Sequence, residues 1–358
     1  MEGMVVSINP SFWQGRKVLI TGHTGFKGTW LSLLLKSVGA KIIGYSLGYP
    51  SQPSLARLVE LENIVHSIQG DIRNYNSLKQ VILKTKPEII IHMAAQSLVR
   101  PAYVDPITTY STNVMGTVNL FESIRQVEGV RVVVNVTSDK CYENQEWYWG
   151  YRENEPMGGY DPYSSSKGCA ELVTSAFRNS FFNAPESAAL ASVRAGNVIG
   201  GGDWATDRLI PDIMRALSQE EVVIIRKPQA IRPWQHVLEP ISGYLMLAEK
   251  LWESGPNYTE AWNFGPLDED TKSVQWIVEY ITQLWGEKAA WKLDKNNHPH
   301  EAHYLKLDCS KAHSRLSWFP KTNLVKALEW VVFWYRHFYE GQEAKALTLA
   351  QIEEFLSL

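Results

Sequence analysis

A tyrosine and a lysine four residues apart are the clearest candidates for chemistry in this chain of 358 residues. The segment DPYSSSKGCAE places Tyr163 and Lys167 at positions i and i+4, which share one face of a helix. A lysine ammonium beside a tyrosine lowers the pKa of the phenol, so the phenol oxygen can take a proton from a substrate hydroxyl. Such a pair is common by chance, so its function depends on the elements around it.

A second candidate group, Ser138, Asp139 and Lys140, lies at the end of a buried strand predicted over 131–139. A carboxyl group and an amine at this place can serve as an acid and a base. The alternative is a surface ion pair, although idle charges are costly at the ligand-binding edge of a sheet. The sequence leaves open which of Asp139 and Lys140 holds the proton.

A glycine-rich turn, LITGHTGFKG, places Gly22, Gly25 and Gly28 between a predicted strand and a predicted helix. Glycine allows a sharp turn and a close approach of the backbone to a pyrophosphate, which the free N–H groups of the helix N-terminus attract. The spacing is G-x-x-G-x-x-G rather than the common dinucleotide fingerprint. The alternative is a turn that only packs the helix on the strand.

The end of the second predicted strand does not decide between NAD and NADP. Its residues Tyr45 and Ser46 include no carboxylate for the ribose and no adjacent arginine for a 2′-phosphate, since Arg57 lies further on. Asp71 follows the third strand, where its carboxylate could meet the adenine amino group. It could equally cap the helix that starts near Asn74.

Alternating strands and helices must position these residues. Apolar, β-branched runs predict strands over 17–22, 40–46, 67–72, 88–94, 131–139 and 189–198. Helical patterns cover 27–38, 74–86, 106–127 and the residues after Pro162. This order predicts an α/β fold, a doubly wound parallel Rossmann sheet with its strand C-termini and ligands at one edge.

The pattern changes after Gly200. We expect residues 1–200 to form the dinucleotide-binding domain, with a returning segment near 233–264. Residues 201–358 should form a smaller, interleaved C-terminal α/β substrate domain. The aromatic helix over 327–341 is expected to cover the core of that second domain.

The composition excludes several classes of protein. With 45% hydrophobic and 20% charged residues the chain is not disordered, and a net charge of -3 indicates no nucleic-acid or membrane partner. Three distant cysteines form no disulfide framework, and the N-terminus resembles no export signal, so a cytoplasmic location is expected. His298, His300, Glu301 and His303 match no zinc spacing, so we expect no metal. His92 and His236 are interpreted as structural or substrate-positioning residues.

Over essentially its whole length the chain resembles the extended short-chain dehydrogenase/reductase family. The resemblance rests on the glycine turn, Asp71, HMAAQ (92–96), NVMGTVN (113–119) and the Tyr163/Lys167 pair. RAGNVIGGGDW (194–204) and RPWQHV (232–237) resemble its nucleotide-sugar dehydratase branch. The resemblance implies bound NAD, held by Gly22, Thr24, Gly25, Phe26, Gly28, Asp71, Ile72, Ala94, Ala95, Gln96, Asn113, Tyr163 and Lys167.

The resemblance also implies a 4,6-dehydration of a nucleotide-linked hexose. Tyr163 would take the 4-hydroxyl proton beside Ser138, Asp139 would protonate the leaving 6-hydroxyl, and Lys140 would remove the C5 proton in place of a glutamate. CDP-glucose is the preferred substrate. The alternatives are UDP-N-acetylglucosamine or dTDP-glucose dehydration, 4-epimerisation of a nucleotide sugar, and a non-catalytic protein that senses dinucleotide.

The resemblance assigns further residues to the substrate. Arg208 and Arg232 would bind the diphosphate and Asn197 the sugar or first phosphate, while Trp204 and Trp234 would stack near the nucleotide. Arg194, Gln96 and Arg100 would line the cleft. The alternatives are interface ion pairs for the arginines and core packing for the tryptophans. The expected substrate residues are Gln96, Arg100, Arg194, Asn197, Trp204, Arg208, Arg232 and Trp234. A homodimer or homotetramer through helices 106–127 and 163–180 is implied as well.

Overall fold

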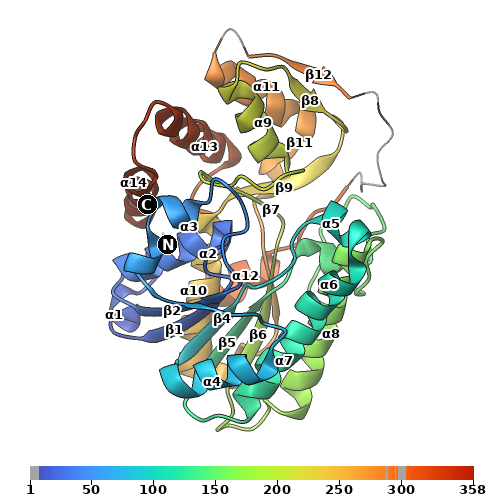
Figure 1. Ribbon diagram of the computed structural model, residues 1–358. Helices are drawn as coiled ribbons and strands as arrows, with labels where there is room; N and C mark the ends of the chain where they lie inside the picture. The colour runs from blue at the N-terminus through green and yellow to red at the C-terminus, as the bar shows by residue number, and fades with distance from the viewer. Residues whose placement is uncertain (1–7, 287–288, 295, 297–303) are drawn as a thin grey trace, which may run out of the picture.

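A seven-stranded parallel sheet forms the centre of the protein, seen in Figure 1 in a computed structural model that describes residues 8–286, 289–294, 296 and 304–358. The strand order is β10-β6-β5-β4-β1-β2-β3, and every neighbouring pair is parallel. This confirms the predicted doubly wound sheet. The strands are β1 (Lys17–Thr21), β2 (Lys41–Ser46), β3 (His66–Gln69), β4 (Ile89–His92), β5 (Val132–Val136), β6 (Ala189–Ala195) and β10 (Ala261–Phe264).

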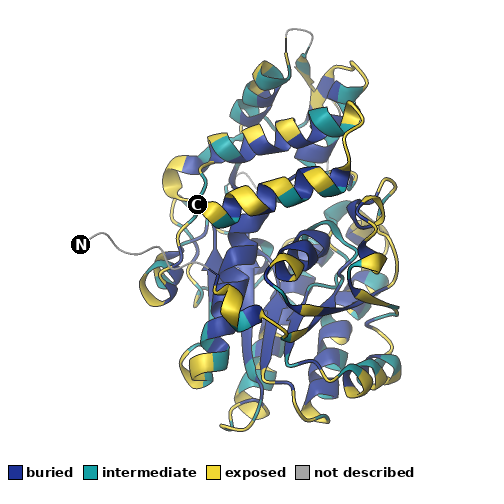
Figure 2. Ribbon diagram, turned by 90° about the vertical axis from the view of Figure 1, so that its left-hand side faces the viewer, coloured by how far each residue is buried: buried dark blue, intermediate teal, exposed yellow. Residues whose placement is uncertain are grey.

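The central strands of this sheet are buried on both faces, which explains why β4 and β5 are almost entirely apolar, whereas the edge strand β3 is polar and largely exposed. Along β4, Ile89 and Ile91 join one hydrophobic core and Ile90 joins the other. The first core is covered by α2 (Phe26–Ser37) and α10 (Leu238–Ser254), and the second by α4 (Tyr75–Thr85), α7 (Gly116–Arg125) and α8 (Pro162–Ser180). Figure 2 shows the buried strands between helices that expose only their outer faces.

The helix predicted over 106–127 forms in three parts. A helix α6 (Pro106–Tyr110) continues into α7 through a single π-helical stretch, η2 (Ser111–Met115). A π-helical turn inserts one extra residue and is often found at functional sites. Here it carries Thr112, which lines the main cavity, and Asn113, which supports the loop after β4.

The strand predicted over 189–198 divides at Gly196. β6 stays in the large sheet, whereas β7 (Asn197–Ile199) pairs with β9 (Ile231–His236) in a three-stranded sheet completed by β11 (Thr271–Ser273). A Cβ at Gly196 would come within 2.4 Å of the Pro233 ring, so the crossing requires a residue without a side chain. One continuous segment of chain therefore connects the two sheets.

The upper part of the molecule in Figure 1 contains β8 (Val223–Ile225) paired with β12 (Trp291–Leu293), together with β11, α9 (Leu209–Ser218) and α11 (Val274–Trp285). Residues 238–264 return to the large sheet as α10 and β10. The remaining helices are α1 (Pro10–Trp13), α3 (Leu55–Leu58), α5 (Val99–Val104), α12 (Ser310–Leu316), α13 (Leu324–Tyr339) and α14 (Ala344–Ser357). Within the described ranges, no helix is long and apolar enough to cross a membrane.

Candidate active site

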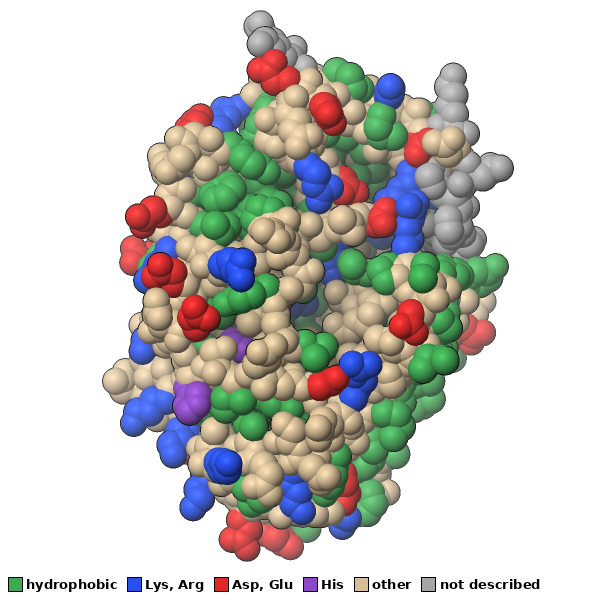
Figure 3. Space-filling view, in the orientation of Figure 1, with side chains coloured by type: hydrophobic (Ala, Val, Ile, Leu, Met, Phe, Trp, Pro, Cys, Tyr) green, Lys and Arg blue, Asp and Glu red, His purple; other side chains and the backbone are tan. Residues whose placement is uncertain are grey.

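A cavity of about 2070 Å³ lies between the carboxyl edge of the large sheet and the upper part of the molecule. Figure 3 shows a hollow on this face of the molecule. Ordinary small-molecule sites measure roughly 300 to 1000 Å³, so this cavity has room for two ligands. Its walls include all five predicted catalytic residues: Ser138, Asp139, Lys140, Tyr163 and Lys167.

The glycine turn forms one wall. Gly22 has φ +75°, and a Cβ there would lie 2.8 Å from the Ala94 nitrogen, while a Cβ at Gly28 would lie 2.3 Å from the Gly22 oxygen. Helix α2 begins after Gly25, which has no side chain to bond the first N–H groups. The first turn of α2 can therefore donate these groups to a phosphate.

Helix α8 supplies the tyrosine and the lysine. Asp161 caps its first turn by accepting from the Ser164 nitrogen at 3.0 Å, and Pro162 fixes the first helical residue. Lys167 Nζ donates to the Val136 oxygen at the end of β5, at 3.4 Å. The cap and this contact hold the Tyr163/Lys167 face of α8 against the end of β5, which leads into Ser138, Asp139 and Lys140.

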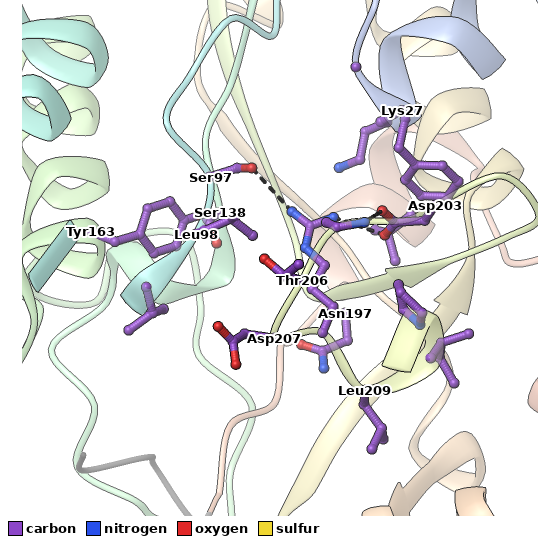
Figure 4. A pocket seen from close by; sticks show the side chains of 18 of the residues that line it. Lys27, Ser97, Leu98, Ser138, Tyr163, Asn197, Asp203, Thr206, Asp207 and Leu209 are labelled. Atoms are coloured by element: carbon purple, nitrogen blue, oxygen red, sulfur yellow. Dashed lines mark hydrogen bonds and ion pairs between the residues drawn. The ribbon is translucent and has the colours of Figure 1, made fainter. Parts of the chain in front are cut away.

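The expected depression of the Tyr163 pKa is wrong for the protein alone. Burial raises the pKa of Tyr163 to about 12, although a hydrogen bond with Ser138 and the charge of Arg208 act to lower it. Burial also lowers the pKa of Lys167 to about 8. Figure 4 shows Tyr163 and Ser138 together on one wall of the cavity.

Asp139 is the most unusual carboxyl group of the site. It is 2% exposed, and its Oδ1 accepts from the Ser138 hydroxyl at 3.1 Å. Among the described residues its other oxygen, Oδ2, has no hydrogen-bond partner. Burial raises the pKa of Asp139 against the opposing effects of Lys140 and Ser138. A buried carboxyl group with a raised pKa is suited to donate a proton.

Lys27 is a cavity residue that sequence reasoning missed. It lies inside the glycine turn, and its Nζ is 3.4 Å from the Tyr244 hydroxyl. Burial lowers its pKa to about 7, with Arg208 and Lys167 acting in the same direction and Asp139 against it. The sequence contained a clue to this position, because Lys27 lies between Gly25 and Gly28 and therefore near the cavity wall that the glycine turn forms.

Most of the predicted binding residues line the cavity, although their roles remain predictions. On the cofactor side these are Gly22, Thr24, Gly25, Phe26, Gly28, Ile72, Ala94, Ala95, Tyr163 and Lys167. On the substrate side they are Arg100, Asn197, Trp204, Arg208, Arg232 and Trp234. Trp204 also packs against Trp334 and Phe338, so its alternative as a core residue is equally visible.

The arginines on the substrate side already form ion pairs across the cavity mouth. Arg208 pairs with Asp203 at 3.0 Å and donates to the Ser97 hydroxyl at 3.2 Å, as Figure 4 shows. Arg100 pairs with Asp207 at 3.0 Å. Ser97, Asp203 and Asp207 were not predicted from the sequence, because these residues lie in loops whose path depends on the tertiary structure.

The structure contradicts the prediction that Arg194 faces the substrate. Its side chain is 4% exposed and pairs with Glu171 at 2.8 Å in the interior. Arg194 lies within β6, opposite Asn263 of β10, where side chains alternate between the two faces of the sheet. Counting to the end of the strand did not reveal which face it takes.

Three predicted cofactor residues also have their side chains engaged elsewhere. The Gln96 amide bonds the Leu98 oxygen and the Thr109 hydroxyl, and Asn113 bonds both the nitrogen and the oxygen of Gln96. Asp71 is held by the Arg73 guanidinium, and Asn74, not Asp71, caps α4. In the structure the side chains of Gln96 and Asn113 shape the loop after β4, and the contacts of Gln96, Asn113 and Asp71 with a ligand stay predictions.

The histidines near the site are buried. Burial lowers the pKa of His92 and of His236 to about 3, so both are neutral at physiological pH. His92 Nδ1 lies 2.6 Å from the Thr21 hydroxyl, a contact that fixes neighbouring strands. Within the described ranges no group of three or more metal-ligating side chains is present, and His298, His300, Glu301 and His303 lie outside the described residues.

A comparison with known proteins identifies the family of this chain. Residues 19–330 match the sequence model of the family described as GDP-mannose 4,6 dehydratase. The chain belongs to this family of nucleotide-sugar dehydratases. The match confirms the resemblance to the dehydratase branch of the extended short-chain dehydrogenases/reductases.

Individual members of the family are similar over nearly the full length. A CDP-glucose 4,6-dehydratase of Salmonella typhimurium is 57% identical over 354 residues, covering 98% of this chain and 99% of the relative. A dTDP-glucose 4,6-dehydratase of Haemophilus influenzae is 26% identical, covering 89% and 97%. The solved structure of a dTDP-glucose 4,6-dehydratase of Bacillus anthracis in complex with NAD is 22% identical, with a TM-score of 0.75, and covers 93% of this chain and all of that one.

Proposed function

We propose that this chain is a CDP-glucose 4,6-dehydratase, which converts CDP-D-glucose to CDP-4-keto-6-deoxy-D-glucose and water. The observation that carries the proposal is the position of Asp139 and Lys140 in one cavity with Tyr163 and Lys167. The identity of 57% to a CDP-glucose 4,6-dehydratase over almost the whole chain supports the choice of nucleotide. Such a reaction needs a hydride acceptor at C4, an acid at the 6-hydroxyl and a base at C5.

We assign the cofactor as NAD. The first turn of α2 and the close approach at Gly22 suit its pyrophosphate, and Ala94 and Ala95 complete that wall. A bound NAD would supply the hydride acceptor for C4 and the hydride donor for C6, so none would be consumed. Lys167 is placed on the same helical face as Tyr163 to hold the ribose.

The chain's own residues perform the proton transfers. Tyr163, with Ser138 beside it, takes the proton of the 4-hydroxyl as C4 becomes a ketone, which requires that the positive charge of a bound oxidised nicotinamide lower the phenol pKa from its value in the protein alone. The ketone acidifies C5–H, and Lys140 removes that proton. Asp139, whose pKa is raised by burial, donates its proton to the 6-hydroxyl, which leaves as water. The ammonium of Lys140, whose protons exchange with solvent, then returns a proton to C5 as the hydride reaches C6.

The substrate diphosphate is assigned to the arginines around the cavity. Arg208, Arg100 and Arg232 line it from three elements, and a guanidinium suits paired phosphate oxygens. The ion pairs of Arg208 with Asp203 and of Arg100 with Asp207 would rearrange or be shared when a diphosphate enters. Trp234 and Trp204 lie on the same side of the cavity and are assigned to the nucleotide end.

The proposal extends to assembly and setting. Helices α5, α6 and α8 expose the apolar side chains of Val104 (86%), Ile107 (80%) and Leu172 (60%), which are suited to the contacts of a homodimer or homotetramer.

The cellular setting and the use of the product are also part of the proposal. The three cysteines are free thiols, which fits the cytoplasm. A 4-keto-6-deoxy sugar nucleotide would supply deoxysugars such as those of lipopolysaccharide O-antigen.

Incubation of the protein with CDP-glucose and catalytic NAD, without reductant, tests this function by mass spectrometry. Loss of one water from the sugar nucleotide without net NADH is expected. Parallel reactions with dTDP-glucose and UDP-N-acetylglucosamine measure the preference for the nucleotide. Binding or epimerisation of CDP-glucose without a change of mass would contradict the proposal.

A further inference from the structure

A buried carboxylate, Glu171, lies one helical turn after Lys167 on α8. It is 4% exposed and accepts three hydrogen bonds from side chains. The Thr137 hydroxyl donates to Oε1 at 2.5 Å, and the Ser192 hydroxyl and the Arg194 guanidinium donate to Oε2, both at 2.8 Å. Burial alone would raise the pKa of Glu171, but Arg194 and the hydroxyl groups hold it below its ordinary value.

These bonds join the two parts of the catalytic apparatus. Thr137 immediately precedes Ser138, Asp139 and Lys140, whereas Glu171 lies on the helix that carries Tyr163 and Lys167. The Thr137–Glu171 hydrogen bond therefore fixes the strand end that carries the acid and base against the helix that carries the tyrosine. A shift at this contact would change the distances between the reacting groups.

Arg194 holds Glu171 from the opposite side. Its guanidinium donates to the Tyr142 hydroxyl at 2.7 Å and to the Glu153 oxygen at 3.0 Å, and it stacks on the Tyr142 ring. Tyr142 in turn donates to Asn263 on β10 at 2.8 Å. A buried ion pair costs much desolvation and is weak evidence for stability, so its location beside Lys167 calls for another explanation.

We propose that Glu171, held by Arg194, is a positioning residue for the dehydration: it anchors the Ser138–Lys140 segment to α8 and supplies the negative charge that keeps Lys167 protonated. This inference rests on the proposed function. It gives Arg194, whose side chain does not face the substrate, a role one layer behind the cavity.

The charges around Lys167 support this role. Burial destabilises its charged form and lowers its pKa to about 8, while Glu171 acts in the opposite direction. The other charged or titratable groups that face Lys167 come from four elements: Tyr163 from α8, Cys141 from η3 (Asp139–Cys141), Lys27 from α2 and His92 from β4. His92 is neutral, Lys27 loses its charge near pH 7 and burial raises the pKa of Cys141, so Glu171 is the main anionic neighbour in this set.

Two variants separate charge from structure. Glu171→Gln keeps the shape and removes the negative charge, so the alkaline limb of the kcat profile should move to lower pH by about one unit, as expected for loss of a close opposite charge. Thr137→Val removes the hydrogen bond to Glu171 and leaves both Glu171 and Arg194 in place, so kcat should fall while the alkaline limb keeps its position. Equal shifts of the limb in both variants, or no shift in Glu171→Gln, would overturn the proposal.

A direct titration keeps the test independent of the reaction. In protein with 13Cε-labelled lysine, the Lys167 resonance is assigned by its loss in Lys167→Arg and followed against pH. Its midpoint should fall by about one pH unit in Glu171→Gln. Glu239→Gln is the matched control, since Glu239 is buried on α10 and bonded to Thr322, and it should leave the midpoint unchanged. An unchanged midpoint in Glu171→Gln would overturn the inference even if the enzyme dehydrates CDP-glucose.

Discussion

Replacing Asp139 with asparagine is predicted to stop the loss of water without harming the fold. The amide keeps the size of the side chain and an oxygen to accept from Ser138, but it has no proton to give to the leaving 6-hydroxyl. General acid catalysis typically contributes a factor of about 10² to 10⁴. Complete burial and the unpaired Oδ2 favour the upper part of this range, so kcat should fall by about 10³ to 10⁴, or roughly 4 to 5.5 kcal/mol.

The same substitution should not lower stability at alkaline pH. Burial raises the pKa of Asp139 above 3.8, so the folded protein binds a proton that the unfolded chain releases, and stability falls as pH rises through this interval. Asparagine has no charge to bury. The melting temperature of Asp139→Asn at pH 8 should therefore equal or exceed that of the unmodified protein.

The assay measures both halves of the reaction. Single-turnover mixing with CDP-glucose should still show the absorbance of reduced nicotinamide, because C4 oxidation needs Tyr163 rather than Asp139. Release of dehydrated product, followed by mass spectrometry, should be slowed. Asp270→Asn is the matched control, a buried carboxyl that accepts from the Leu324 nitrogen. Normal product release in Asp139→Asn, or loss of C4 oxidation as well, would refute the assignment.

Three further predictions follow from other parts of the structure. Lys140→Met should reduce kcat by about 10² to 10⁴ while C4 oxidation persists; a variant with normal turnover of CDP-glucose would favour a 4-epimerase. Gly22→Ala forces a side chain into φ +75° and against the Ala94 nitrogen, a strain of about 1 to 2 kcal/mol that should weaken NAD binding about tenfold by calorimetry; unchanged affinity would contradict the close approach. Burial raises the pKa of Glu249 to about 7, so the protein should lose stability as pH rises from 4.5 to 7; Glu249→Gln should flatten that fall in urea unfolding, and an equally steep fall would contradict it.

The sequence predicted the large sheet because its central strands are buried on both faces. A run of isoleucines such as Ile89–Ile91 is typical of a buried central strand. The glycine turn and the Tyr163/Lys167 spacing are local patterns that do not depend on distant parts of the chain. The division at Gly196 was not predictable, since it depends on Pro233 packing against that backbone from a distant part of the chain.

The sequence predicted those site residues whose position follows from the end of a single strand. It did not predict where a side chain points when a distant part of the chain binds it. Ser138, Asp139 and Lys140 reach the cavity because the end of β5 faces it. Arg194 and Gln96 are also polar residues near the ends of strands. In the folded protein, however, Arg194 pairs with Glu171, and Gln96 bonds the backbone of the loop after β4. Sequence position alone contains no record of such partners.

The most direct test of the central claim follows one hydrogen atom through the reaction. CDP-glucose carrying deuterium at C4 is incubated with the protein and catalytic NAD, and the product is examined by NMR and mass spectrometry. If the chain catalyses a 4,6-dehydration, the deuterium moves to C6 of the product within the same sugar, and one solvent-derived hydrogen enters C5. Deuterium retained at C4, or a product of unchanged mass, would contradict the assignment of Asp139, Lys140 and Tyr163 to a 4,6-dehydration.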